Sequence, residues 1–144
     1  PDSKFTLANF LRAQLYSTMA TLKIGMDILA EEHVAIDSLM GHGGLFKTPL
    51  VMQKVLAAAV NTPVTVMATA SEGGAWGIAL LAAYLADGKK DGKLEDYLDN
   101  RVFKDLTGAA VAPDPADVAG FETFTEHYVK GLAVEKAAIE AIDW

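Results

Sequence analysis

The strongest constraint on the fold is a stretch in which strand and helix signals alternate. Val34 to Met40 is a short apolar run that ends in the glycine-rich loop Gly41-His42-Gly43-Gly44, as strands that run into tight loops do. A helix to about Val60 follows, and the β-branched residues of Val64 to Met67 indicate a second strand. This order predicts a parallel βαβ unit with a right-handed crossover, and hence an α/β fold.

Several helices are expected around this unit. Apolar residues recur every three or four positions from about Asn9 to Glu31, which predicts a long helix that is apolar around more than half its circumference and therefore well covered. Thr48 as N-cap and Pro49 at the first helical position predict the start of the next helix. Ala75 to Ala86 is rich in Ala and Leu and is expected to pack closely against the sheet.

The C-terminal third is predicted to be helical as well. Leu94 to Phe103 has the pattern of a short amphipathic helix, and a loop is expected through Pro113. Asp114 then provides an N-cap, with a proline at the first helical position. We expect Gly131 to end this helix, and Val134 to Ile142 to form the last one.

Composition narrows the class of protein. The 144 residues suffice for one domain, and a net charge of −7 without a basic stripe argues against nucleic-acid binding. The absence of cysteine fits a reducing compartment, and no apolar run is long enough to span a bilayer, so a soluble, cytoplasmic protein with no membrane contact is expected. The chain starts at Pro1 without an initiator Met, which suggests an excised or processed piece.

Two glycine loops are the candidate ligand sites. Gly41, Gly43 and Gly44 follow the first predicted strand, and Gly73 and Gly74 follow the second. Because open α/β sheets bind ligands at the carboxyl ends of parallel strands, the two loops together favour a nucleotide or phosphate site. Taken alone, each loop is a weak signal and the first is more typical of a structural turn, and neither has the Walker or dinucleotide spacing.

No catalytic or metal-binding residue can be assigned from the sequence. His33, His42 and His127 lack ligand spacing, no serine lies in a nucleophile elbow, and the carboxylates have the spacing of solvated helix faces. Most aromatic residues are expected in the core. Phe46, beside the first glycine loop, is the one aromatic candidate for a nucleotide pocket.

Three blocks of sequence together resemble the C-terminal domain of FGGY carbohydrate kinases. Arg12-Ala13 is similar to a recurrent Arg-Ala pair in a long helix of that family. GHGGLFKTPLVMQKVLAAAVNTPV resembles its glycine loop, its Gln-containing helix and the next strand, and ASEGGAWGIALLAAYL resembles the turn and helix after it. The resemblance covers roughly Phe5 to Leu85, and it continues less specifically into a tail like that of ribulokinase and xylulokinase relatives.

The resemblance implies an actin-like ATPase (ribonuclease H-like) fold, of which residues 1–144 would be the C-terminal part of the second domain. It implies ATP with Mg²⁺ as cofactor and a sugar as phosphate acceptor. Adenosine is expected against Gly43 and Gly44, with weaker assignments to Gly41, to Phe46 and to Gly73-Gly74 in the second loop. A bulky ring at Phe46 departs from the family pattern, and so does the indole of Trp76.

The resemblance also implies what this stretch lacks. The sugar pocket belongs to an N-terminal domain and the catalytic aspartate precedes the long helix, so the 144 residues alone are expected to be inactive. The predicted strand Val34 to Met40 would then have an exposed edge, which favours a homodimer. Two alternatives stay open, namely a non-catalytic α/β nucleotide-binding module and a small interaction domain in which both glycine loops are turns.

Overall fold

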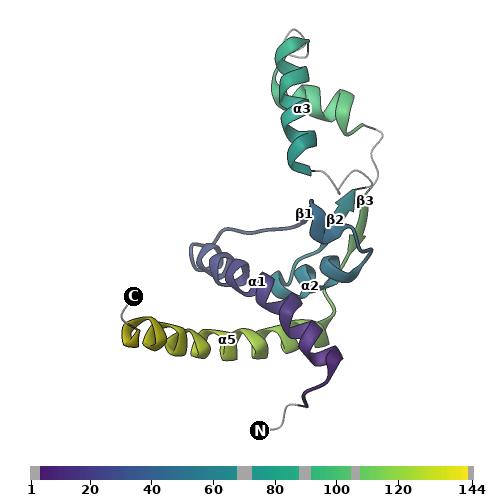
Figure 1. Ribbon diagram of the computed structural model, residues 1–144. Coiled ribbons are helices and arrows are strands. Elements are labelled where there is room, and N and C mark those ends of the chain that lie inside the picture. Colours follow the sequence, from purple (N-terminus) through teal and green to yellow (C-terminus); the bar gives the residue numbers. More distant parts are fainter. Residues whose placement is uncertain (1–3, 68–72, 88–91, 105–107, 143–144) are drawn as a thin grey trace.

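The computed structural model describes residues 4–67, 73–87, 92–104 and 108–142, which form a mixed α/β structure with one small sheet (Figure 1). In chain order the elements are α1 (Leu7–Glu31), β1 (Leu39–Gly41), the 3-10 turn η1 (Gly44–Phe46), α2 (Val51–Val60), β2 (Val64–Met67), α3 (Gly73–Ala86), α4 (Leu94–Tyr97), the π-helical turn η4 (Leu98–Val102), β3 (Gly108–Val111) and α5 (Pro115–Ala141). No helix among the described residues is long and apolar enough to cross a membrane.

The sheet has the strand order β1-β2-β3, and the predicted parallel pair is confirmed. β1 and β2 are parallel, with Leu39 opposite Val64. β2 and β3 are antiparallel, with Val64 opposite Val111. The expectation of a loop through Pro113 was wrong, because β3 lies within that segment. Its sequence of Gly, two Ala and one Val carries little strand propensity, and pairing with β2 determines its conformation.

The first predicted strand is much shorter than expected. Only Leu39–Gly41 is a strand, whereas the residues from Val34 to Ser38 lie outside any ladder. The backbone N–H of Leu39 donates to Pro63 O at 2.9 Å, just before β2 begins. Because Leu39 is already opposite Val64, the first residue of β2, the apolar run before Leu39 has no strand residue to pair with.

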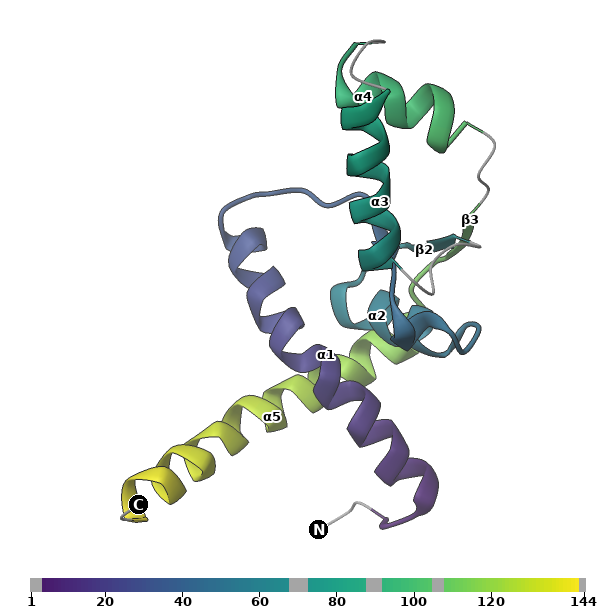
Figure 2. The ribbon, with the colours of Figure 1, turned by 45° about the horizontal axis from the view of Figure 1, so that its top comes forward.

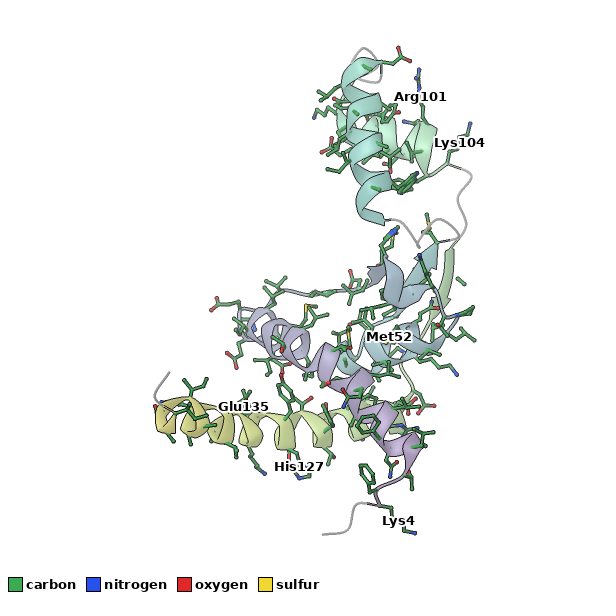
Figure 3. All side chains as sticks on the ribbon, viewed as in Figure 1. Lys4, Met52, Arg101, Lys104, His127 and Glu135 are labelled. Atoms are coloured by element: carbon green, nitrogen blue, oxygen red, sulfur yellow. The ribbon has the colours of Figure 1, made fainter. Side chains whose placement is uncertain are left out.

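The core lies where α1, α2 and α5 meet beneath the sheet, and Figure 2 shows α1 and α5 crossing. Met52 of α2 is buried in this region (Figure 3), and Phe121 of α5 is fully buried. Tyr16 of α1 packs against the ring of Phe121 with a centroid separation of 4.7 Å. The small side chains of Ala57 to Ala59 let the helices approach closely.

The expectation that α1 is well covered was wrong. Thr6 caps the helix, its side chain accepting a hydrogen bond from the Asn9 N–H at 3.2 Å, but only Tyr16, Met19 and Ala20 are buried. The exposed apolar residues of this helix are Leu7, Phe10, Leu11, Leu22, Ile28 and Leu29. The apolar pattern correctly predicted the helix itself. Its apolar residues are exposed because α2 and α5 together cover only one strip of it.

Two predicted helix boundaries were also wrong. α2 begins at Val51 and not at Pro49, because Leu50 has left-handed backbone angles and serves as the N-cap without a side-chain hydrogen bond. Gly131 does not end a helix, since α5 runs without a break from Pro115 to Ala141. The predicted Asp114 cap is confirmed, because its side chain accepts from the N–H of Ala116 at 2.8 Å.

The helix expected to pack against the sheet stands away from it instead. α3 and the α4–η4 segment form a hairpin that projects beyond the strands (Figure 1). Ring contacts hold this hairpin together, with Trp76 against Phe103 and Tyr84 against Tyr97 at centroid separations of 5.9 and 5.5 Å. The opposite face of α3 is apolar and exposed, and its largest residues are Ile78, Leu81 and Leu85.

Candidate functional site

The first glycine loop begins with a close contact that requires glycine. Gly41 is buried at the end of β1, and a Cβ atom placed on it would lie 2.5 Å from a carbon of the Phe46 ring. Phe46 therefore folds back over the start of its own loop and packs against the core. The ring thus packs against the first residue of the loop, and its part in a nucleotide pocket stays a prediction.

The middle of this loop has an open, glycine-specific backbone. Gly43 has φ +98° and ψ −178°, a combination that residues with a Cβ essentially do not adopt. The N–H of Phe46 donates to Gly43 O at 3.0 Å and the N–H of Lys47 donates to Gly44 O at 3.2 Å. A Cβ on Gly43 or Gly44 would have no neighbour within 4 Å, so a ligand has space to approach the main chain there.

The second glycine pair lies at the start of α3, directly against the first loop. Ser71 and Glu72 lie outside the described residues, whereas Gly73 and Gly74 form the first turn of the helix. A Cβ on Gly73 would lie 2.7 Å from the Cβ of His42. The prediction that the two loops are neighbours is therefore confirmed, and the contact between them is Gly73 against His42.

His42 connects the loops through more than this one contact. Its imidazole lies nearly parallel to the indole of Trp76, with an interplanar angle of 19° and a centroid separation of 6.4 Å. Its Nδ1 atom is buried and has no hydrogen-bond partner among the described residues. The sequence places His42 in the first glycine loop and disfavours it as a metal ligand. Its contacts with Gly73 and Trp76 could not be predicted, because these residues are distant in sequence.

Gln53 is a second residue whose role was missed. It is 5% exposed on α2, and its Nε2 donates to Val64 O at 2.7 Å and to Ala109 O at 2.6 Å. One side chain thus ties the helix after the glycine loop to both β2 and β3. A single polar residue on the apolar face of a helix was the signal that could have identified it.

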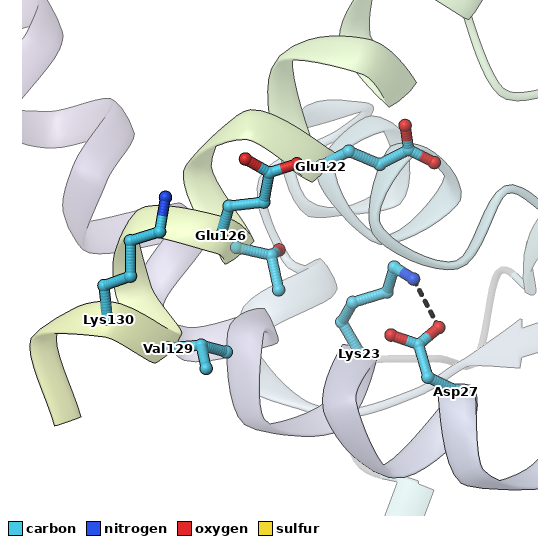
Figure 4. A pocket seen from close by; sticks show the side chains of 7 residues that line it. Lys23, Asp27, Glu122, Glu126, Val129 and Lys130 are labelled. Carbon is cyan, nitrogen blue, oxygen red and sulfur yellow. Dashed lines mark hydrogen bonds and ion pairs between the residues drawn. The ribbon is translucent and has the colours of Figure 1, made fainter. Parts of the chain in front are cut away.

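The charged side chains gather in a different place. A groove of about 540 Å³ between α1 and α5 is lined by Lys23, Asp27, Glu122, Glu126 and Lys130, together with Thr125 and Val129. Figure 4 shows the ion pair between Lys23 and Asp27 on one wall. In the part of the chain that the structure describes, no three His, Cys, Asp or Glu side chains are arranged to hold a metal ion. At the described part of the glycine loops the open surface is main chain, and no described group of such side chains is arranged for a metal ion.

The comparison with protein families agrees with this arrangement. The model of the C-terminal domain of the FGGY family of carbohydrate kinases matches residues 1–86, which include α1, the βαβ unit, both glycine loops and α3. None of the curated proteins is similar enough to the chain to count as a match. Since the family match covers more than half of the 144 residues, the chain belongs to the FGGY family of carbohydrate kinases.

Proposed function

We propose that this chain is the nucleotide-binding, C-terminal part of a kinase that uses ATP to phosphorylate a hydroxyl group of a pentulose or a similar sugar or polyol. The observation that carries the proposal is the contact between Gly73 and His42 within the region of the family match. This contact brings two glycine loops together at the carboxyl ends of the parallel strands β1 and β2, where open α/β sheets bind ligands.

The open backbone at Gly43 and Gly44 supports a nucleotide at the first loop. A ligand can come against this main chain because neither position has a side chain and a Cβ there would meet no other atom within 4 Å. Adenosine is proposed to lie against Gly43 and Gly44. The packing of the Phe46 ring against Gly41 would hold the loop in position. Gly73 and Gly74 would then border the nucleotide from the α3 side.

Bound ATP would supply the phosphoryl group, and Mg²⁺ would neutralise the charge on its phosphates. Among the described residues no cluster of carboxylates or imidazoles is arranged as a metal site. Mg²⁺ is therefore proposed to arrive on the nucleotide, since it is commonly bound through phosphate oxygens and water with few protein ligands. The work of these 144 residues would be to position the nucleotide.

The remaining parts of the reaction are proposed to reside elsewhere in a cytoplasmic, two-domain, actin-like kinase. The resemblance assigns the sugar pocket to an N-terminal domain and the catalytic aspartate to strands before the long helix. Phosphoryl transfer needs a residue that orients the acceptor hydroxyl as well as a bound nucleotide. The 144-residue chain alone is therefore expected to bind nucleotide without transferring phosphate.

Two measurements on the purified chain test this function. Calorimetric titration with ADP should give saturable heat, and a coupled assay with ATP, Mg²⁺ and a panel of pentuloses and polyols should give no sugar-dependent ADP release. A titration of the Gly43→Ala variant is the control, because a side chain there obstructs the proposed contact surface. Sugar-dependent release of ADP would show that the 144 residues transfer phosphate by themselves, which contradicts the proposal. Equal heat from the unmodified chain and from Gly43→Ala would contradict the assignment of nucleotide binding to the first glycine loop.

A further inference from the structure

His42 is the described side chain that bridges the proposed nucleotide loop and the projecting hairpin. Its Cβ lies against the Cα of Gly73 so closely that a methyl group on Gly73 would be 2.7 Å away. Its ring faces the Trp76 indole, and Trp76 in turn packs edge-on against Phe103. The rings of His42, Trp76 and Phe103 thus form a continuous series from the GHGG loop to η4.

Among the described residues, the hairpin shows few other contacts with the body. None of the described residues of α3 takes part in an extensive contact with the sheet or with α1, α2 or α5, and Figure 1 shows the hairpin projecting past the strands. α3 is instead held by the Trp76–Phe103 and Tyr84–Tyr97 ring contacts within the hairpin itself. His42 therefore provides a direct route by which a displacement of the GHGG loop can reach the hairpin.

We propose that His42 is a positioning residue that couples the GHGG loop to the α3 hairpin, so that a nucleotide bound at Gly43 and Gly44 changes the surroundings of Trp76. This inference rests on the proposed function, because it needs a nucleotide at that loop. The coupling runs through the ring of His42 and its contact with Gly73. Substitutions of His42 that keep an aromatic ring, in a chain that keeps glycine at position 73, should preserve the coupling.

Fluorescence of Trp76 provides the direct readout. The sequence has two tryptophans, so the Trp144→Phe variant leaves Trp76 as the single emitter. Addition of ADP should produce a saturable change in its emission, with the same midpoint as the heat measured by calorimetry. His42→Ala in this background should abolish the change and weaken ADP binding about two- to tenfold, the factor expected for the loss of one ring pair.

Two further comparisons separate coupling from a general loss of structure. His42→Phe retains an aromatic ring and should retain the emission change. Gly73→Ala should lose it, because the added methyl group collides with His42, whereas Gly77→Ala in the same helix should keep it, because nothing lies within 4 Å of that position. Both glycine variants add the same methyl group to α3, so a difference between them reports the contact with His42.

The outcomes distinguish failure of the inference from failure of the proposed function. ADP heat without a change in Trp76 emission overturns the coupling and leaves nucleotide binding intact. Equal emission changes in Gly73→Ala and Gly77→Ala, or loss of the change in His42→Phe, also overturn it. Absence of ADP heat in the unmodified chain refutes the proposed function, and the inference about His42 falls with it. Urea unfolding of each variant verifies that it is folded at the temperature of the titration.

Discussion

Gly43 has a backbone conformation that is specific to glycine, and it lies in the proposed nucleotide site. Its φ of +98° and ψ of −178° lie in a region that is essentially restricted to glycine, so Gly43→Ala should lower the free energy of unfolding by about 1–3 kcal/mol. Gly44→Ala should cost less, because Gly44 does not have positive φ and a methyl group there meets no atom within 4 Å. Urea denaturation of both variants measures the difference, and equal losses would contradict this description of the loop.

Tyr16 makes stability depend on pH in the alkaline range. Burial raises the pKa of its phenol, the charge of Arg12 lowers the pKa and the charge of Asp117 raises it, with burial as the largest effect. A raised pKa in the folded state means that the neutral phenol is favoured by folding. The stabilisation is complete below the pKa of the unfolded chain, about 10, and is lost as pH rises through the higher pKa of the folded state.

Tyr16→Phe should therefore remove part of the alkaline loss of stability. The difference in unfolding free energy between Tyr16→Phe and the unmodified chain should be constant around neutral pH and should shift in favour of the variant above pH ~10. Urea unfolding at a series of pH values measures this. Parallel curves for the two proteins up to the highest pH would show that the phenol ionises equally in both states. The two proteins differ only at position 16, so the comparison isolates the phenol of Tyr16.

The glycines of the site could be predicted from sequence, whereas their partners could not. Glycines after a strand indicate a turn or an open loop, so the loop at Gly43 and Gly44 could be predicted from local pattern, whereas its role as a nucleotide site came from the family resemblance and stays a prediction. The contact of His42 with Gly73 and the bonds from Gln53 to Val64 and Ala109 depend on tertiary packing. A single sequence does not reveal such contacts, because the partner residues are far apart along the chain.

At the scale of elements, α5 shows that a single glycine does not end a helix when good helix formers follow it. Gly131 was predicted to end a helix, yet α5 continues for ten residues beyond it, to Ala141. One glycine costs a helix only about 1 kcal/mol relative to alanine, and good helix formers follow on its C-terminal side. Strand β3 was missed for the converse reason, since its small residues have weak propensity and are held by pairing with β2.

Replacing Gly131 should consequently strengthen the distal half of α5. A methyl group at that position meets no atom within 4 Å, so Gly131→Ala should increase helicity at 222 nm and raise the free energy of unfolding by up to about 1 kcal/mol. Gly25→Ala in α1, which is equally unobstructed, is the matched control and should behave alike. A decrease in helicity for Gly131→Ala alone would indicate that the chain bends at this residue.

At the scale of the whole molecule, the exposed apolar surface is the dominant feature. Besides α1 and α3, the distal part of α5 exposes Leu132, Val134 and Ile139 (Figure 3 shows this arm around Glu135). β1 is an edge strand of the sheet, and the side chain of Met40 on it is 54% exposed. Unprotected edges pair with other chains, so we propose that two copies associate through β1.

Light scattering of a concentration series tests this association. The unmodified chain should show a mass of two copies that falls on dilution, and Met40→Lys should shift it toward one copy, because two lysines would meet across the paired edges. Met40→Leu keeps the apolar side chain and should remain associated. A mass of one copy for the unmodified chain at all concentrations would contradict the edge as an interface, and an unchanged mass for Met40→Lys would place the interface on another apolar surface.

Backbone amide NMR during an ADP titration tests most directly whether the GHGG loop of this FGGY-family chain is its nucleotide site. This measurement detects weak binding and also locates it. We predict saturable shifts of the Gly43 and Gly44 amide resonances, followed by those in the first turn of α3, with no shift in the distal half of α5. Saturable shifts confined to the groove between α1 and α5, or none at all, would contradict the claim.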